Sequence, residues 1–287
     1  TDRVAEMHGH FGQFRLFVAE SAAAKYRHFQ ERDMSLGHQL QVVSSVFAST
    51  FAAWRGSSVF KQRKTPAERP ILFDIEASPY CRLVREACTA LQLDIEIRPC
   101  PKGGSRFRAE AEHLGGKQQF PLLVDSNSGV VLYESADIVA YLFKAYGRGE
   151  TPSRYRASKW QKGGSYVATI ARGLKGLNAK PSLAPAQPLA LWSFESSPYS
   201  RLVRERLCEL ELPYTLYNLG KEQWADVGPA TRRVKSGPYV PMVGGKREAF
   251  LKQYGRVQVP YLEDPNTGAA LFESEDILAY LDRTYAR

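Results

Sequence analysis

A nine-residue segment occurs twice in this chain of 287 residues, and this repeat constrains the fold more than any other feature of the sequence. Ser78-Pro-Tyr-Cys-Arg-Leu-Val-Arg-Glu86 returns 119 residues later as Ser197-Pro-Tyr-Ser-Arg-Leu-Val-Arg-Glu205, with a single difference. A second block, from Asp125 to Ile138, returns from Asp264 to Ile277, 139 residues later. Two similar blocks in the same order indicate a duplicated domain, whose second copy carries about twenty extra residues between the blocks.

The first half of each copy has the pattern of a strand, a helix and a second strand. Short apolar runs after a proline, at residues 70–74 and 188–192, are typical of a buried strand. Ser78-Pro79 and Ser197-Pro198 then favour a helix start, because serine suits the N-cap and proline the first turn. The segments 94–98 and 214–218 predict the second strand.

The second half of each copy predicts a hairpin followed by a helix. Phe120-Pro121 and Val259-Pro260 lead into a third strand, and a glycine-containing turn joins it to a fourth. Glu134-Ser135 and Glu273-Ser274 then begin a final helix. The order βαβ followed by ββα predicts an α/β protein with two tandem thioredoxin-like domains.

These motifs resemble the N-terminal domain of glutathione transferases, which belongs to the glutaredoxin branch of the thioredoxin fold. The resemblance covers roughly residues 70–146 and 188–285, and Gly115-Gly-Lys-Gln-Gln-Phe-Pro121 is similar to a group of plant and algal plastid proteins built from two such domains. We therefore expect a first domain at 70–146 and a second at 188–287. Residues 1–69 form a helical N-terminal extension, and residues 147–187 a basic linker. The resemblance implies a plastid location.

Neither copy has the attacking cysteine of a glutaredoxin. Ser78 and Ser197 occupy that position at the start of the helix, and a serine hydroxyl cannot form a mixed disulfide. Cys81 remains at the second position, where the thiol normally resolves a disulfide. We therefore expect no dithiol exchange. No residue is assigned as catalytic, and the candidates for such a role are Ser78, Cys81 and Ser197.

The resemblance also implies a glutathione site, in which a serine at the first position hydrogen-bonds the glutathione thiol. The residue before the family's cis-proline offers its backbone to the tripeptide, and a Glu-Ser pair binds the γ-glutamyl end. The matching residues here are Phe120, Pro121, Glu134, Ser135, Val259, Pro260, Glu273 and Ser274. All of these residue types also stabilise helix starts and turns without any ligand.

The N-terminal extension contains an apolar stripe. Residues 14–29 read as a helix, and Val43, Val46, Phe47, Phe51 and Trp54 recur at three- and four-residue spacing on one side of a second helix. Three alternatives stay open for the stripe, namely packing on the first domain, contact with another protein, or lodging at a membrane surface.

The linker holds most of the chain's positive charge. Between Arg148 and Lys180 there are eight Lys and Arg residues and one Glu, which accounts for +7 of the net +9. This charge stands where no domain core needs it. Either it is solvated, or it contacts an anionic surface such as an acidic protein, RNA or lipid headgroups. The interface candidates are Val43, Phe47, Phe51, Trp54, Arg154, Arg156, Lys159 and Lys162.

The remaining composition is that of a globular protein in a reducing compartment. The four cysteines fit no disulfide framework and no zinc site, and no apolar run is long enough to span a membrane. We expect no metal, because His8 and His10 lack further ligands nearby. The chain begins at Thr1 without an initiator Met, which fits a targeting peptide that either has been removed or is not included in this sequence.

The sequence thus favours a catalytically degenerate binding or assembly subunit of a larger complex, for which no cofactor is required. The alternative is a glutathione-dependent enzyme. It would be either a transferase that uses Ser197 or Ser78 or a monothiol reductase that uses Cys81.

Overall fold

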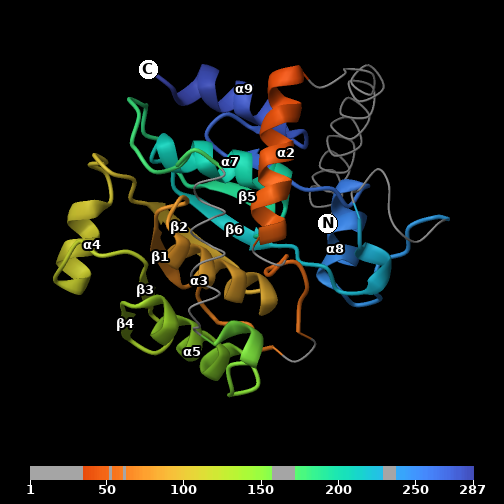
Figure 1. The fold of residues 1–287 in the computed structure, drawn as a ribbon, viewed down its shortest axis with the longest axis horizontal. Coiled ribbons are helices and arrows are strands. Elements are labelled where there is room, and N and C mark those ends of the chain that lie inside the picture. Colours follow the sequence, from red (N-terminus) through yellow and green to blue (C-terminus); the bar gives the residue numbers. More distant parts are fainter. Residues whose placement is uncertain (1–34, 52–53, 61–62, 157–171, 229–236) are drawn as a thin grey trace, which may run out of the picture. The chain divides into compact units, whose positions relative to one another are not determined.

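The computed structural model describes residues 35–51, 54–60, 63–156, 172–228 and 237–287 (Figure 1). The chain divides into two units, residues 1–39 and 40–287, and every contact given below lies within the second. The helix expected at residues 14–29 lies outside the described residues.

Both copies contain the predicted elements in the predicted order. The first copy consists of β1 (Ile71–Asp74), α3 (Pro79–Ala90), β2 (Ile95–Pro99), α4 (Arg108–Gly115), β3 (Leu122–Asp125), β4 (Val130–Leu132) and α5 (Ser135–Tyr146). The second consists of β5 (Leu189–Ser193), α7 (Pro198–Glu209), β6 (Tyr214–Asn218), α8 (Lys246–Tyr254), β7 (Tyr261–Asp264), β8 (Ala269–Leu271) and α9 (Ser274–Tyr285). The predicted α/β fold with two thioredoxin-like copies is confirmed.

Among the described residues, three further elements lie outside the strands and helices of the two copies. Helix α2 (Leu36–Phe51) precedes the first copy, and a short 3-10 helix (Ser153–Tyr155) follows it. A second 3-10 helix (Trp224–Asp226) belongs to the stretch of extra residues in the second copy.

The two copies share one sheet, which the sequence did not predict. Its strand order is β4-β3-β1-β2-β6-β5-β7-β8, and β2 pairs with β6 in antiparallel orientation. Glu96 pairs with Thr215, its own counterpart in the repeat, and Ile95 pairs with Leu216. The contact is therefore self-complementary, like a twofold interface between identical subunits.

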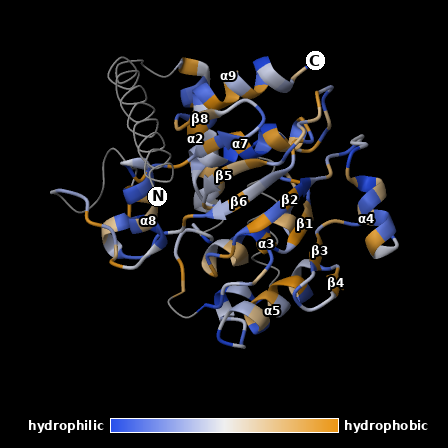
Figure 2. Cartoon of the chain, turned by 180° about the vertical axis from the view of Figure 1, so that it is seen from behind, coloured by the Kyte–Doolittle hydropathy of each residue, from blue (hydrophilic) through white to orange (hydrophobic). Residues whose placement is uncertain are grey.

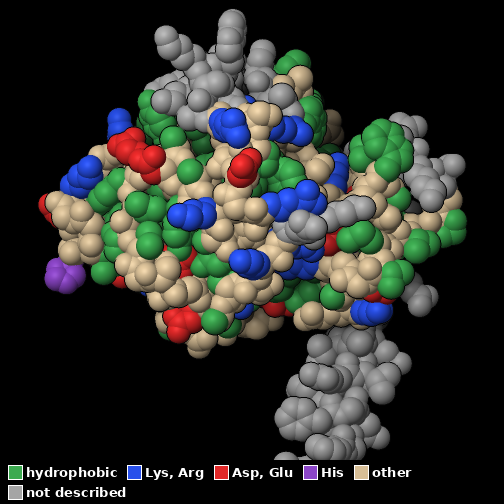
Figure 3. All heavy atoms as spheres, turned by 90° about the horizontal axis from the view of Figure 1, so that it is seen from below, with side chains coloured by type: hydrophobic (Ala, Val, Ile, Leu, Met, Phe, Trp, Pro, Cys, Tyr) green, Lys and Arg blue, Asp and Glu red, His purple; other side chains and the backbone are tan. Residues whose placement is uncertain are grey.

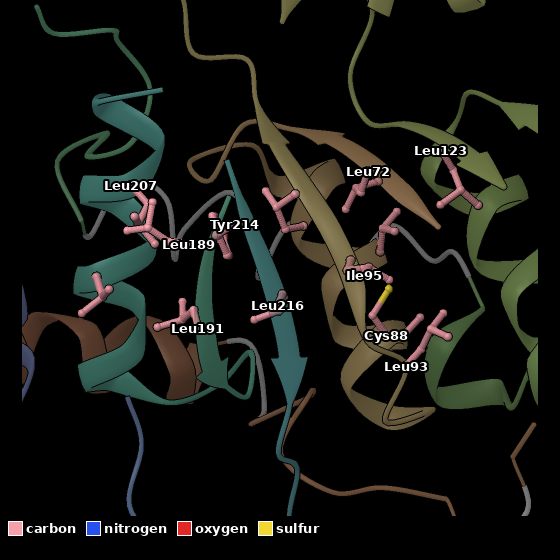
Figure 4. Close-up of a cluster of buried hydrophobic side chains, with 14 of the residues drawn as sticks. Leu72, Cys88, Leu93, Ile95, Leu123, Leu189, Leu191, Leu207, Tyr214 and Leu216 are labelled. Atoms are coloured by element: carbon pink, nitrogen blue, oxygen red, sulfur yellow. The ribbon is translucent and has the colours of Figure 1, made fainter. Parts of the chain in front are cut away.

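One hydrophobic core runs along this sheet through both copies. Helices α3, α5, α7 and α9 supply side chains to it from one face, and Figure 4 shows Ile95 and Leu216 meeting near the junction of the copies. Helices α4 and α8 cover smaller clusters on the opposite face. The strands of the first copy are mainly hydrophobic, whereas α9 alternates polar and apolar residues, as expected for an outer helix (Figure 2).

A buried charge cluster connects the helices of the two copies. Arg85 Nη1 lies 2.7 Å from Asp74 Oδ1, and Arg85 Nε lies 3.0 Å from Glu195 Oε2 of the other copy. Arg204 reciprocates, with Nη2 3.1 Å from Glu76 Oε1 and 3.0 Å from Glu195 Oε2. Both guanidinium side chains are 1% exposed, so each depends on a carboxylate that the other copy provides.

The segment before each copy packs on the other copy. Lys221 N donates to Ser57 O at 2.7 Å, and its counterpart Lys102 N donates to Leu177 O at 2.7 Å. Gly56 and Gly176 both have positive φ, and a Cβ there would lie 2.7 Å from Glu195 Cβ and 3.0 Å from Glu76 Cβ respectively. Only glycine therefore allows these two close approaches.

We predict that Glu195→Gln lowers the free energy of unfolding of the whole chain by about 3–5 kcal/mol, because it leaves two buried guanidinium groups undercompensated. Urea denaturation, followed by tryptophan fluorescence and by circular dichroism, measures this loss. A single transition is expected because the copies share a core. As a control, Glu96→Gln removes one of the two carboxylate partners of the partly exposed Arg98 and should cost under about 1 kcal/mol. Equal losses for the two variants would mean that the cluster does not hold the copies together.

Candidate functional site

The candidate residues of the first copy gather at one end of its strands. Strand β1 ends shortly before Ser78, and β3, which is antiparallel to β1, starts directly after Pro121, with Phe73 opposite Leu122. Strand β4 ends just before Glu134, with Leu132 opposite Leu123. The topology therefore brings the helix start, the proline turn and the Glu-Ser pair to the same edge, as the resemblance requires.

Ser78 caps helix α3 and is half-buried. Its side-chain oxygen accepts from Cys81 N at 3.4 Å, and its hydroxyl also hydrogen-bonds the buried Cys81 thiol. Such a hydroxyl can donate a hydrogen bond to an anionic sulfur. The first copy therefore presents a hydrogen-bond donor where a glutaredoxin presents a thiolate.

Cys81 is inaccessible. Its side chain is fully buried, and Sγ accepts from Ile75 N at 3.4 Å. Burial, and next the Asp74 carboxylate, raise the pKa of the Cys81 thiol well above its ordinary value. At neutral pH this thiol is protonated, so it lacks the property that makes a cysteine nucleophilic.

The other three cysteines are buried as well. Burial raises the pKa of the Cys88, Cys100 and Cys208 thiols, and all four cysteines are unpaired by disulfides. Cys208 Sγ donates to Gly176 O at 3.2 Å, so this thiol helps to hold the segment that precedes the second copy. Among the described residues, no group of His, Cys, Asp and Glu side chains is arranged to hold a metal ion. His8 and His10 lie outside the described residues.

The proline turns and Glu-Ser pairs have the same arrangement in both copies with one difference. The Phe120-Pro121 and Val259-Pro260 bonds are both cis. Glu134 has φ 60°, in the left-handed region that a non-glycine residue seldom adopts, whereas Glu273 has φ −76°. Unusual backbone conformations of this kind concentrate at ligand sites. At the glutamate of the Glu-Ser pair, the first copy has such a conformation and the second does not.

Both glutamates are exposed, and each accepts a hydrogen bond from a glutamine of the proline turn. Gln119 Nε2 donates to Glu134 Oε1, and Gln258 Nε2 donates to Glu273 Oε1 at 2.8 Å. Ser135 and Ser274 are buried at the starts of α5 and α9. The carboxylates are therefore the members of the Glu-Ser pairs that a ligand from solvent can reach.

In the second copy, helix α2 covers the serine position. Ser45 Oγ donates to Pro198 O and Ser49 Oγ donates to Ser196 O, each at 2.9 Å. Ser197 is only 2% exposed, and Ser200, which replaces Cys81 in this copy, is fully buried. A ligand can therefore reach Ser197 only if α2 moves away.

The apolar stripe of α2 faces away from the protein. The side packed on the second copy carries Ser45, Ala48 and Ser49, while Val43 is 50% and Phe47 57% exposed. The stripe therefore packs on neither copy. Trp54 does not extend it along the helix, because α2 ends at Phe51 and Trp54 adopts φ 51° in the following turn.

Part of the basic segment is paired with carboxylates of this chain, contrary to the expectation that no domain core needs its charge. Arg172 is 6% exposed and is bound by Glu205, with Nη2 2.6 Å from Oε2. Lys180 Nζ lies 2.5 Å from Glu209 Oε2. Arg154 and Arg156 are exposed, and Lys159 and Lys162 lie outside the described residues. The end of the segment nearest the second copy thus neutralises this chain's own glutamates.

Sequence reasoning did not identify the two short segments that precede each copy and pack on the other copy. Their signal is short: Trp54-Arg55-Gly56 and Leu174-Lys175-Gly176 share an apolar residue, a cation and a glycine, 120 residues apart. Trp54 and Leu174 both have positive φ, as do the two glycines. The repeat therefore begins before the first strand, in residues that read as extension and linker.

Comparison with known proteins agrees with this geometry. The model of the glutathione S-transferase N-terminal domain matches residues 72–152 and 191–287, which is more than half of the chain. No curated protein and no solved structure gave a significant match. None of the described helices is long and apolar enough to cross a membrane. From the duplicated βαβ-ββα order, the two proline turns and this match, the chain belongs to the glutathione S-transferase N-terminal domain family, which it represents twice.

Proposed function

We propose that this protein is a catalytically degenerate member of the family that serves as a binding or assembly subunit of a larger complex, located in a plastid as its resemblance to the two-domain plastid group implies. The observation that carries the proposal is the absence of an accessible nucleophilic thiol among the described residues, since both first positions are serine and all four cysteines are buried.

The redox alternative has little chemical support. A reductase needs a thiol that is exposed and deprotonated at neutral pH. Cys81 is fully buried, and burial raises the pKa of its thiol. A monothiol reductase based on Cys81 would have to open the start of helix α3 before each turnover.

The stripe on α2 is the surface that best suits a protein partner. Leu40, Val43 and Phe47 are 63%, 50% and 57% exposed and follow one another along one side of the helix. Contiguous exposed apolar side chains of this kind mark interaction surfaces. The opposite side of α2 is fixed by Ser45 and Ser49, so the helix presents the stripe rigidly. The proposed occupant is an apolar groove on another protein subunit.

The basic segment would add an electrostatic contact to this anchor. Arg154 and Arg156 carry this part of the proposal because both side chains are exposed. On the face drawn in Figure 3, Lys and Arg side chains occur in several separate groups between hydrophobic and uncharged ones. Such a distribution favours local pairing with an acidic protein over RNA or lipid headgroups, which present continuous negative charge.

Glutathione binding by the first copy is the second candidate. Two observations favour the first copy over the second: Ser78 is half-buried where Ser197 is 2% exposed, and Glu134 has the strained backbone that Glu273 lacks. In this candidate function, Ser78 donates to the glutathione sulfur, Phe120 offers its backbone beside Pro121, and Glu134 binds the γ-glutamyl amine. Transferase activity through Ser197 has no such support.

The thiols provide the first test. We predict that a thiol-specific reagent labels none of the four cysteines in the native protein and all four in urea, because labelling requires an exposed thiolate. Ser78→Cys should add one rapidly labelled thiol and some glutathione-dependent disulfide reductase activity, since it restores a thiol at a helix start. Fast native labelling of Cys81, with wild-type reductase activity that Cys81→Ser abolishes, would refute the degenerate function.

The apolar stripe provides the second test. In extracts of the native source, the wild-type protein should migrate with a large complex on gel filtration, and Phe47→Asp should shift it to the size of the free chain. A charge in a buried apolar contact costs several kcal/mol, and about 1.4 kcal/mol corresponds to a tenfold loss of affinity. Leu114→Asp is the control, because Leu114 is 41% exposed on α4, away from the stripe. Unchanged migration of Phe47→Asp would remove the stripe from the proposed interface.

The duplication supplies a matched pair for the glutathione test. If the first copy binds glutathione, calorimetry should detect an affinity of about −4 to −6 kcal/mol, which corresponds to a millimolar to high micromolar dissociation constant. Glu134→Ala should weaken it at least tenfold, whereas Glu273→Ala should leave it unchanged. If no heat is detected at a glutathione concentration of roughly ten times a millimolar dissociation constant, the Glu-Ser pairs serve only to start the helices.

A further inference from the structure

A small cavity lies among the charged side chains where the two copies meet. Its volume is about 20 Å³, and its wall contains five cationic side chains and three carboxylates, from both copies and from the segment before the second copy. The five cations are the four buried arginines Arg82, Arg85, Arg172 and Arg201, together with Lys175, and the carboxylates are Glu76, Glu195 and Glu205. Positive charge is therefore in excess in a place from which bulk water is largely excluded.

Arg201 binds neutral acceptors rather than a carboxylate. Its guanidinium group donates to Ser45 O at 3.1 Å and to Ser49 Oγ at 3.0 Å, both of them neutral acceptors. Within the described part of the chain, no carboxylate lies within ion-pair distance of Arg201, which is 3% exposed. Burial, and next the charge of Arg82, lower the pKa of Arg201 to about 9.

Arg82, the counterpart of Arg201 in the first copy, is only partly compensated. Its Nε lies 3.2 Å from Glu86 Oε1, but Glu86 also pairs with Arg55, so one carboxylate serves two guanidinium groups. Arg82 is 5% exposed, and its Nη2 atom has no hydrogen-bond partner in the described structure. A buried guanidinium nitrogen left without an acceptor costs free energy that an anion would recover.

The carboxylates of the wall do not balance this excess. Glu195 Oε2 is 3.0 Å from both Arg85 Nε and Arg204 Nη2, so its charge is already neutralised twice. Its other oxygen, Oε1, lies 4.0 Å from Arg82 Nε and has no hydrogen-bond partner in the same set of residues. Glu205 is bound to Arg172 through both of its oxygens. Burial raises the pKa of Glu76 to about 7, against the opposing effect of Arg204 and Arg85, with which this carboxylate already pairs.

We propose that this cavity is a binding site for chloride, held between Arg82 and Arg201 at the junction of the two copies. The cavity, of about 20 Å³, suits a small ligand, and a monatomic anion is the smallest group that carries the negative charge these guanidinium groups lack. The bound ion neutralises two guanidinium groups that come from different copies. Chloride therefore stabilises the contact between the copies and is a structural ligand, independent of any glutathione site.

Unfolding in urea at constant ionic strength tests the site, with sodium chloride exchanged stepwise for sodium gluconate. Above the dissociation constant, each tenfold increase in chloride should lower the unfolding equilibrium constant about tenfold, as mass action requires for one ion released on unfolding. Arg82→Gln should abolish this dependence. Arg206→Gln should keep it, because Arg206 pairs with Glu209 and Asp282, outside the cavity wall.

Crystals of the wild-type protein grown in sodium bromide provide a second measurement, which does not depend on whether the variants fold. Anomalous scattering should show a bromide peak between the guanidinium groups of Arg82 and Arg201. Equal stability in chloride and gluconate, or a map without a peak at this position, would overturn the proposal. In that case a water molecule between Arg82 Nη2 and Glu195 Oε1 would satisfy the two unpartnered atoms.

Discussion

The antiparallel pairing of β2 with β6 is the contact on which the rest of this structure depends. It joins the two copies edge to edge, so that each protects a strand that would be an open sheet edge in the isolated copy. It also places α3 beside α7 over the shared face of the sheet, where their arginines meet the other copy's glutamates. The hydrophobic core is then continuous across the junction, and both copies belong to one compact unit.

This junction also decides which of the two family sites is accessible. Because the chain before each copy crosses to the other copy, α2 and the turn after it lie over the helix start of the second copy. Ser197 is thereby buried, although its sequence motif is nearly identical to that of Ser78. Two copies of one motif thus occupy different environments in the described part of the chain, where Ser78 is half-buried and Ser197 is 2% exposed.

The sequence predicted the elements of each copy well, because strand runs, the Ser-Pro helix start and the Glu-Ser helix start are local signals. It could not predict the shared sheet, since alternation in residues 95–97 reads the same in an edge strand and in a central one. Buried guanidinium groups were missed for a similar reason. Arg82 and Arg85 stand at helical positions that ordinarily face solvent, and only a second copy packed against α3 buries them. The expectation that no domain core needs the charge of the linker was wrong for Arg172, because this residue pairs with Glu205, which is distant in the sequence.

The near-identity of the two nine-residue segments has a physical explanation that does not involve catalysis. Their first positions are serines and their fourth positions differ, so the shared residues do not preserve a reactive thiol. Among the eight positions that they share, the leucine and valine are buried, and the second arginine of each segment, Arg85 or Arg204, pairs with a glutamate of the other copy. In a contact with approximate twofold symmetry, a residue of one segment lies close to the equivalent residue of the other segment or to that residue's neighbours. A change at Arg85 or Arg204 therefore disturbs both copies.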